Sequence, residues 1–142
     1  MTINDLVGRW RLTAWTATDE TGAVTMPFGA QPQGGVIYTA GGWMSGQLAA
    51  DSRPTLSTPI ALAGTEAERA QAYSTYIAYS GEYRVEGDTV IHTLRMSLFP
   101  NWVGTEQRRT VELSGDRLVL RTPPTPVGDR VLVNALHWIR AE

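Results

Sequence analysis

The sequence predicts an all-β protein, an antiparallel up-and-down barrel of about eight to ten strands with one short helix. About nine segments alternate apolar and polar residues with the period of two that β-strands require. Turns rich in glycine, proline and aspartate separate these segments, and neither strand–helix–strand alternation nor heptads occur. The 142 residues are expected to form a single domain, 1–142, long enough to bury a hydrophobic core.

The N-terminal half contains the first strands and the expected helix. A strand from about Leu6 to Thr18 precedes a turn at 19–22 and a short strand over 23–28. Segments 36–39 and 43–48 predict a hairpin, although the alternation leaves open which side faces inward. Residues 49–64 lose periodicity, and Thr65 with Glu68 then forms a capping box that predicts a helix. This segment is either a lid over the barrel mouth or a helix that plugs or flanks the barrel.

The C-terminal half contains the strands expected to carry interior polar groups. Strands from Tyr79 onward are separated by Gly-Asp turns at 87–88 and 115–116, which predict two hairpins. One of these strands places His92 on its apolar face, which comprises Val90, His92, Leu94, Met96 and Leu98. The next places Gln107 and Arg109 on the face that also carries Val103, Val111 and Leu113. Interior polar groups need partners from the protein or from a ligand. A proline-rich loop over 123–128 and a strand over 130–140 follow.

Several motifs resemble the lipocalin-like domain family of bacteria and fungi, a group of small calycin-type barrels. The most specific is SLFPNWVGTEQ at 97–107; GRWRLTAW at 8–15 and VIYTAGGWMSGQL at 36–48 fit the same pattern. The resemblance covers nearly the whole chain and implies a barrel with an internal pocket, but no single reaction. It also implies that Trp10 plugs the closed end against an arginine of the last strand, Arg140, and that Leu136 and Trp138 face inward.

Composition excludes several chemistries. All twelve basic residues are arginine and the formal net charge is −2, so electrostatic binding of nucleic acid is not expected. Lysine and cysteine are absent, which excludes Schiff-base and thiol catalysis. With only two histidines, no metal site is expected, and no cofactor-binding motif occurs.

The sequence also leads to expectations about cellular location and self-association. No apolar run approaches the roughly 18 residues that a membrane span requires, and no signal peptide is evident, so a soluble cytoplasmic protein is expected. The arginine-rich, lysine-free composition suggests a bacterial source. An exposed Trp15 or Trp43 would mark the surface of a homodimer.

Two functions fit the expected interior. In the first, the barrel binds a hydrophobic or amphiphilic small molecule; in the second, the same pocket is a cofactor-free enzyme, a cyclase, isomerase or hydrolase using acid/base chemistry. The candidate catalytic residues are His92, Arg109 and Tyr83. The candidate ligand-binding residues are Tyr79, Gln107, Asn134, Asn101, Trp102, Met96 and Trp138. For His92 three roles stay open: a satisfied core histidine, a donor to a ligand, or a catalytic acid or base.

Overall fold

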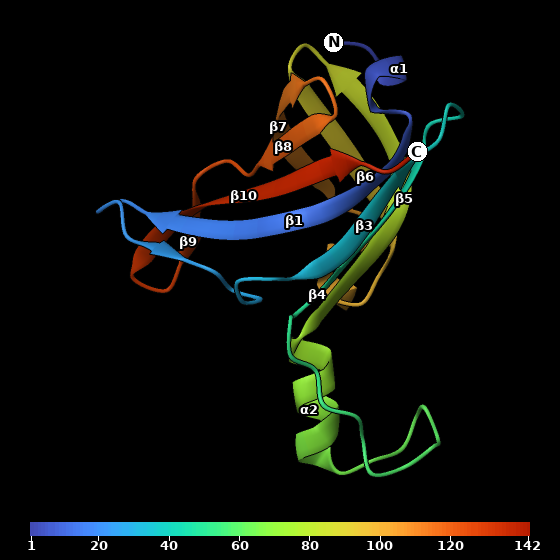
Figure 1. Ribbon diagram of the computed structural model, residues 1–142, viewed down its shortest axis with the longest axis vertical. Helices are drawn as coiled ribbons and strands as arrows, with labels where there is room; N and C mark the ends of the chain where they lie inside the picture. Colours follow the sequence, from blue (N-terminus) through green and yellow to red (C-terminus); the bar gives the residue numbers. More distant parts are fainter.

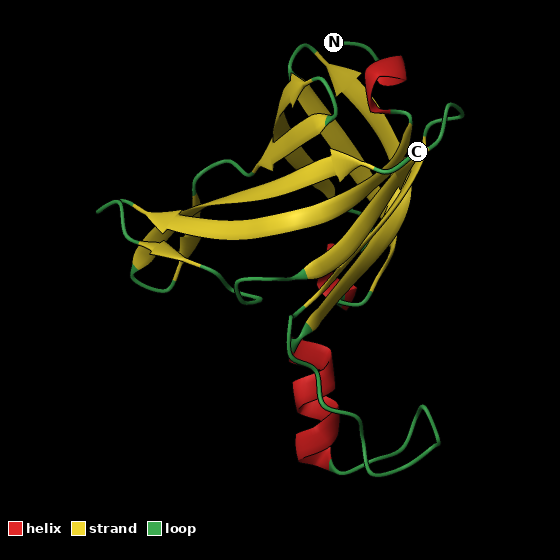
Figure 2. Cartoon of the chain, viewed as in Figure 1, coloured by secondary structure: helices red, strands yellow, loops and turns green.

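The computed structural model describes all residues from Met1 to Glu142 and shows a closed eight-stranded antiparallel barrel with two additional strands (Figures 1 and 2). The barrel order is β1-β3-β4-β5-β6-β7-β8-β10, and pairing of β1 with β10 closes it. The elements are α1 (Ile3–Leu6), β1 (Gly8–Asp19), β2 (Val24–Thr25), β3 (Gln33–Tyr38), β4 (Trp43–Ala49), α2 (Glu66–Ser74), β5 (Tyr76–Glu86), β6 (Thr89–Ser97), η1 (Pro100–Trp102), β7 (Glu106–Ser114), β8 (Arg117–Arg121), β9 (Thr125–Val127) and β10 (Arg130–Arg140).

The predicted fold class and hairpins are confirmed, while several boundaries differ. Gly87 and Gly115 adopt positive φ angles of 62° and 60° in the two Gly-Asp turns, a conformation that glycine adopts without steric cost. The strand expected from Tyr79 begins earlier, at Tyr76, one residue after α2, which ends at Ser74. The strand expected from Val103 begins only at Glu106, after a turn. The proline-rich loop contains β9, and the strand expected over 23–28 is only the two residues of β2.

The closed end of the barrel is built around Trp10, which is fully buried. Its indole N–H donates to the Leu6 carbonyl at 2.9 Å, and the Arg140 guanidinium lies 4.2 Å from the ring centroid. Arg140 also donates to the carbonyls of Val7 and Asp5, at 2.9 and 3.0 Å, and so holds the N-terminal turn over the end of the barrel. The predicted contact between Trp10 and Arg140 is confirmed.

The half of the barrel next to this end is filled by side chains. Alternation in the β3–β4 hairpin, left open by the sequence, places Met44 and Leu48 inside and Trp43 outside. Leu136 and Trp138 of β10 are buried as expected, and His137 is only half-buried. The main cluster comprises Leu6, Trp10, Leu12, Phe28, Val36, Tyr38, Met44, Leu48, Tyr83, Val90, Val111, Leu118, Leu120, Leu136 and Trp138.

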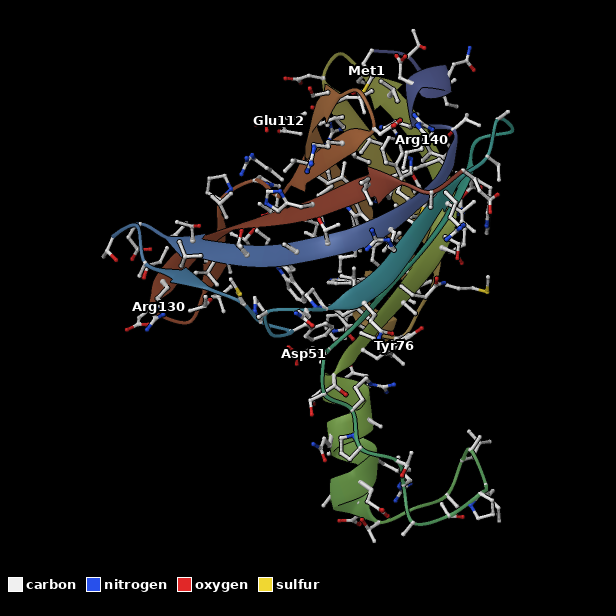
Figure 3. The ribbon with its side chains drawn as sticks, in the orientation of Figure 1. Met1, Asp51, Tyr76, Glu112, Arg130 and Arg140 are labelled. Carbon is white, nitrogen blue, oxygen red and sulfur yellow. The ribbon has the colours of Figure 1, made fainter.

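The segment between β4 and β5 forms an arm that projects from the end of the barrel opposite both chain termini (Figure 1). Asp51 and Tyr76 mark its root in Figure 3. The capping box is confirmed, since Thr65 Oγ1 accepts from the Glu68 N–H and the Thr65 N–H donates to Glu68 Oε1. No residue of α2 is buried, so the helix neither covers the mouth nor plugs the barrel in this structure. No helix has the length and hydropathy that crossing a membrane would demand.

A β-bulge in β6 changes which side chains face the interior. Ser80 pairs with Met96 but Gly81 pairs with Leu94, so β6 carries one extra residue, Arg95. Beyond this point the faces exchange: Met96 is 62% exposed, and the Ser97 hydroxyl is buried without a partner. The sequence prediction that Met96 faces the interior is therefore wrong.

Replacing Gly81 with alanine is expected to destabilise the protein by about 1–3 kcal/mol, because the new Cβ would overlap the Thr93 carbonyl of the bulged strand. Gly46, also on a strand, is the matched control: its nearest neighbours lie 3.7 Å from the Cβ position, so Gly46→Ala should change stability much less. Urea unfolding of both variants measures the difference. Equal losses would show that the bulge does not depend on a residue without a side chain at position 81.

Candidate functional site

The open half of the barrel contains a cavity of about 580 Å³, within the range of sites for small ligands. Its walls come from five barrel strands, β1, β4, β5, β7 and β10, together with η1, β9 and the segment between β8 and β9. The lining residues are Trp15, Leu48, Ile77, Tyr79, Trp102, Glu106, Gln107, Arg108, Arg109, Thr122, Pro123, Thr125, Asn134 and Leu136. The filled half of the barrel forms its floor.

Aromatic rings supply much of the cavity wall. Tyr79 and Trp102 meet edge to face with their ring centroids 5.9 Å apart, and Trp15 packs in the same manner against Phe28 at 4.7 Å. The aliphatic side chains of Leu48, Ile77 and Leu136 complete this wall. A flat apolar molecule would therefore contact both ring faces and aliphatic groups.

Trp15 and Asn134 form a pair across the seam between β1 and β10. The Trp15 indole N–H donates to Asn134 Oδ1 at 2.9 Å. An indole nitrogen only donates, so this bond identifies which end of the amide is the oxygen and fixes its orientation. The Asn134 NH₂ group at the other end forms no hydrogen bond with the protein. The amide is thus a free donor in the cavity wall.

Two arginines line the cavity: Arg108 is paired with Glu86 and Glu106, and Arg109 is the one without an ion pair. Its guanidinium donates to Gln107 Oε1 at 2.9 Å and to the Arg108 carbonyl at 2.7 Å. Both acceptors are neutral, and no carboxylate forms an ion pair with Arg109. The side chains of Gln107 and Arg109 thus satisfy part of each other's hydrogen-bonding capacity. Glu82 is not a partner of Arg109, because it pairs with Arg95 at 2.6 Å on the outer surface.

The cavity floor contains a buried pair, Tyr38 and His92. Tyr38 Oη and His92 Nε2 are joined by a hydrogen bond of 2.7 Å, and His92 Nδ1 has no partner. Burial, assisted by the positive charge of Arg109, lowers the pKa of His92 from 6.5 to about 3. Burial raises the pKa of Tyr79, against the opposing effect of Arg109. At neutral pH the imidazole is uncharged and the phenol keeps its proton.

Five of the candidate site residues meet at the cavity: Arg109, Tyr79, Gln107, Asn134 and Trp102. Two of the catalytic candidates lie beneath it. His92 is 1% exposed and bonded to Tyr38, and the Tyr83 hydroxyl donates to the Thr39 carbonyl, within the filled half.

Three ligand-binding candidates also lie elsewhere. Met96 is turned outward by the bulge, and Asn101 is exposed on η1. Trp138 is inward but pairs in register with Leu12 and Leu118, two residues closer to the closed end than Leu136, so it belongs to the packed core. None of these three residues lines the cavity.

Sequence reasoning missed the role of Trp15, which it treated as a candidate for an exposed dimer contact. Alternation from Trp10 and Leu12 would point residue 15 outward. The register of β1 against β10 shifts between Leu12 and Ala14, and this irregularity turns Trp15 into the cavity. No glycine marks this bulge in the sequence, whereas Gly81 within a strand pattern was a signal for the one in β6.

Metal-binding groups are scattered over the structure. Nowhere do three histidine or carboxylate side chains come close enough together to hold a metal ion. The one carboxylate in the cavity lining, Glu106, is held by Arg84 at 2.7 Å and by Arg108 at 3.7 Å. The groups that face the cavity without partners are hydrogen-bond donors and a guanidinium, which suit ligand oxygens.

An antiparallel barrel closed at one end and hollow at the other defines a calycin-type fold. The chain belongs to the lipocalin-like domain family, which matches residues 7–141. Over 87 residues, 56% of this chain and 78% of the relative, it is 41% identical to the 4'-hydroxy-3'-methoxypropiophenone carrier protein ppsC of Aspergillus oryzae.

Two solved structures are similar to this chain over most of its length. An uncharacterized protein from Bacteroides eggerthii is 14% identical with a TM-score of 0.45, covering 95% of this chain and 98% of its own. A point mutant of the fluorescent protein UnaG is 12% identical with a TM-score of 0.42, covering 99% of both chains.

Proposed function

We propose that this protein is a carrier that binds one small aromatic ketone with further oxygen substituents, such as a hydroxyphenyl ketone, inside the barrel. The observation that carries the proposal is the pairing of an aromatic wall with donors that lack acceptors. Arg109 and the amide of Asn134 have N–H groups to spare, and the Tyr79 hydroxyl forms no hydrogen bond with the protein. Ketone, phenol and ether oxygens accept hydrogen bonds and would satisfy these groups. The name of the Aspergillus oryzae relative supports the same class of ligand.

The alternative, a cofactor-free acid/base enzyme, receives less support from this geometry. His92, the candidate catalytic acid or base, lies under the cavity with its Nε2 bonded to Tyr38. With a pKa of about 3 it is a weak base and is almost entirely unprotonated at neutral pH. We infer that His92 supports the floor by holding Tyr38. Chromatography of the ketone after prolonged incubation with the protein distinguishes a carrier from an enzyme, since a carrier returns its ligand unchanged.

The protein is expected to bind 4'-hydroxy-3'-methoxypropiophenone with one ligand per chain. Titration calorimetry measures the stoichiometry, and quenching of tryptophan fluorescence reports the site because Trp15 and Trp102 line it. Asn134→Ala removes a donor to the ligand and the acceptor of the Trp15 indole, so affinity should fall about tenfold, or about 1.4 kcal/mol.

Asn101→Ala is the matched control, because Asn101 is exposed and does not line the cavity. Its affinity should equal that of the unmodified protein. Absence of saturable binding by the ketone would overturn the proposed function, and equal losses in the two variants would place the ligand outside the cavity.

A further inference from the structure

Resting on the proposed function, we propose that the cavity binds its hydroxyphenyl ketone as the phenolate, with the negative oxygen paired to the guanidinium of Arg109. The proposal concerns the ionisation state of the bound ligand rather than its presence. It makes the protein a receptor for acidic phenols, in preference to neutral aromatic molecules of the same shape.

The first observation is that Arg109 is a cation without a counter-charge. Its side chain is half-buried at the cavity wall, and its two hydrogen bonds go to neutral oxygens. A guanidinium has five N–H groups, so others remain for a ligand. Removing a cation from water without an anion is costly, and an anionic ligand offsets that cost.

The second observation is that no nearby carboxylate competes for Arg109. Glu106 lines the cavity, but it alternates to the other face of β7 and is engaged by Arg84 and Arg108. The remaining acceptors around Arg109 are the amide oxygen of Gln107 and a backbone carbonyl. An incoming phenolate would therefore form the first ion pair of this guanidinium.

The third observation is that the charge of Arg109 already acts on neighbouring phenols. It opposes the rise that burial produces in the pKa of Tyr38 and Tyr79. A ligand phenol placed against the guanidinium would be subject to the same field at shorter range. An opposite charge at contact distance typically lowers a pKa by about 1–3 units.

The unpartnered donors favour the same form of the ligand. The Asn134 amide and the Tyr79 hydroxyl donate hydrogen bonds, which are stronger to charged than to neutral acceptors. A ketone group in conjugation with the ring spreads the phenolate charge over both ends of the molecule. Both ends of the anion would then meet donors.

The test is a pH titration of 4'-hydroxy-3'-methoxypropiophenone, followed by its ultraviolet absorption, with and without saturating protein. Ionisation of the phenol shifts the absorption to longer wavelength, so the spectrum reports the bound species directly. The expected result is that the pKa of the phenol is at least about one unit lower when bound, a roughly tenfold higher ratio of phenolate to phenol. Calorimetry measures binding independently.

Four comparisons assign the effect to the charge of Arg109. Arg109→Gln should abolish the shift while Arg109→Lys retains most of it, which separates charge from structure. Arg95→Gln, which removes an arginine ion-paired with Glu82 on the outer surface, should retain the full shift. The methyl ether 3',4'-dimethoxypropiophenone, which cannot ionise, should bind the unmodified protein at least about tenfold more weakly than the phenol at alkaline pH.

The outcomes distinguish the two proposals. Binding of the ketone with an unshifted pKa overturns the phenolate inference and leaves the carrier function intact. Lack of binding overturns the carrier function itself. A shift that persists in Arg109→Gln overturns the role of this residue; if that variant does not fold, the Arg109→Lys variant and the methyl ether decide the question.

Discussion

Replacing Trp10 with alanine is expected to lower the free energy of unfolding by about 3–5 kcal/mol. The indole is fully buried, donates to the Leu6 carbonyl and stacks on Arg140, so its removal empties the closed end of the barrel. The change also leaves the carbonyl of Leu6 without its donor and the Arg140 guanidinium without its aromatic partner. Because Arg140 holds α1 in place, the loss extends to the N-terminal turn.

Urea-induced unfolding followed by circular dichroism measures this effect. Trp43→Ala is the matched control, because Trp43 lies on the outer face of β4 and is 38% exposed; its loss should be about 0.5 kcal/mol or less. Trp10→Phe preserves much of the packing and should give an intermediate loss if alanine prevents folding. Similar losses for Trp10→Ala and Trp43→Ala would contradict the role of Trp10 as the plug.

Acidification is expected to destabilise the protein through His92, before the carboxylates take part. The folded protein holds the pKa of His92 at about 3, below its ordinary value of 6.5. Between these values the unfolded chain binds a proton that the folded protein excludes, so stability present above about pH 6.5 is lost as the pH falls. The slope is about 1.4 kcal/mol per pH unit, or about 2–3 kcal/mol between about pH 6.5 and about pH 4.5.

The carboxylates act in the same direction but at lower pH. Hydrogen bonds or ion pairs lower the pKa of Glu68, Glu82, Glu106 and Glu112, so their contributions are lost only as the pH falls from about their ordinary range. Unfolding curves at several pH values between about 7.5 and 5.5, above the ordinary range of the carboxylates, therefore isolate His92. His92→Gln, which does not titrate, should remove most of the slope. A slope unchanged in that variant would show that His92 is not the group responsible.

The sequence predicted the barrel because a closed antiparallel sheet repeats one local pattern many times. Alternation, Gly-Asp turns and the capping box are each readable within a few residues; the turns and the capping box agree with the structure, and alternation agrees outside the two bulges. The cavity was harder to predict because its lining depends on register. A bulge in β1 and another in β6 each exchange the inward and outward faces of their strand. As a result Trp15 lies in the cavity wall and Met96 lies on the outer surface.

The position of a residue along the barrel axis was the second property that the sequence could not predict. Alternation correctly turned His92 and Tyr83 inward, and the family resemblance did the same for Trp138. Neither contains information about whether an inward residue meets the cavity or the packed floor. That distinction depends on how far along the barrel axis each residue lies and on which side chains from other strands fill the space. Gln107 and Arg109 reach the cavity because they lie near the start of β7, whereas Val111 further along the same face is already in the packed core.

The pairing of β1 with β10 joins strands from opposite ends of the chain, with Trp10 beside Arg140 and Trp15 beside Leu136. During synthesis on a ribosome, no cavity with a complete wall can exist until the final strand has emerged, because Asn134 and Leu136 belong to it. Contacts of such long sequence separation also make folding slow compared with that of helical proteins of similar size. Until that strand is in place, the nascent chain presents two unpaired strand edges to its surroundings.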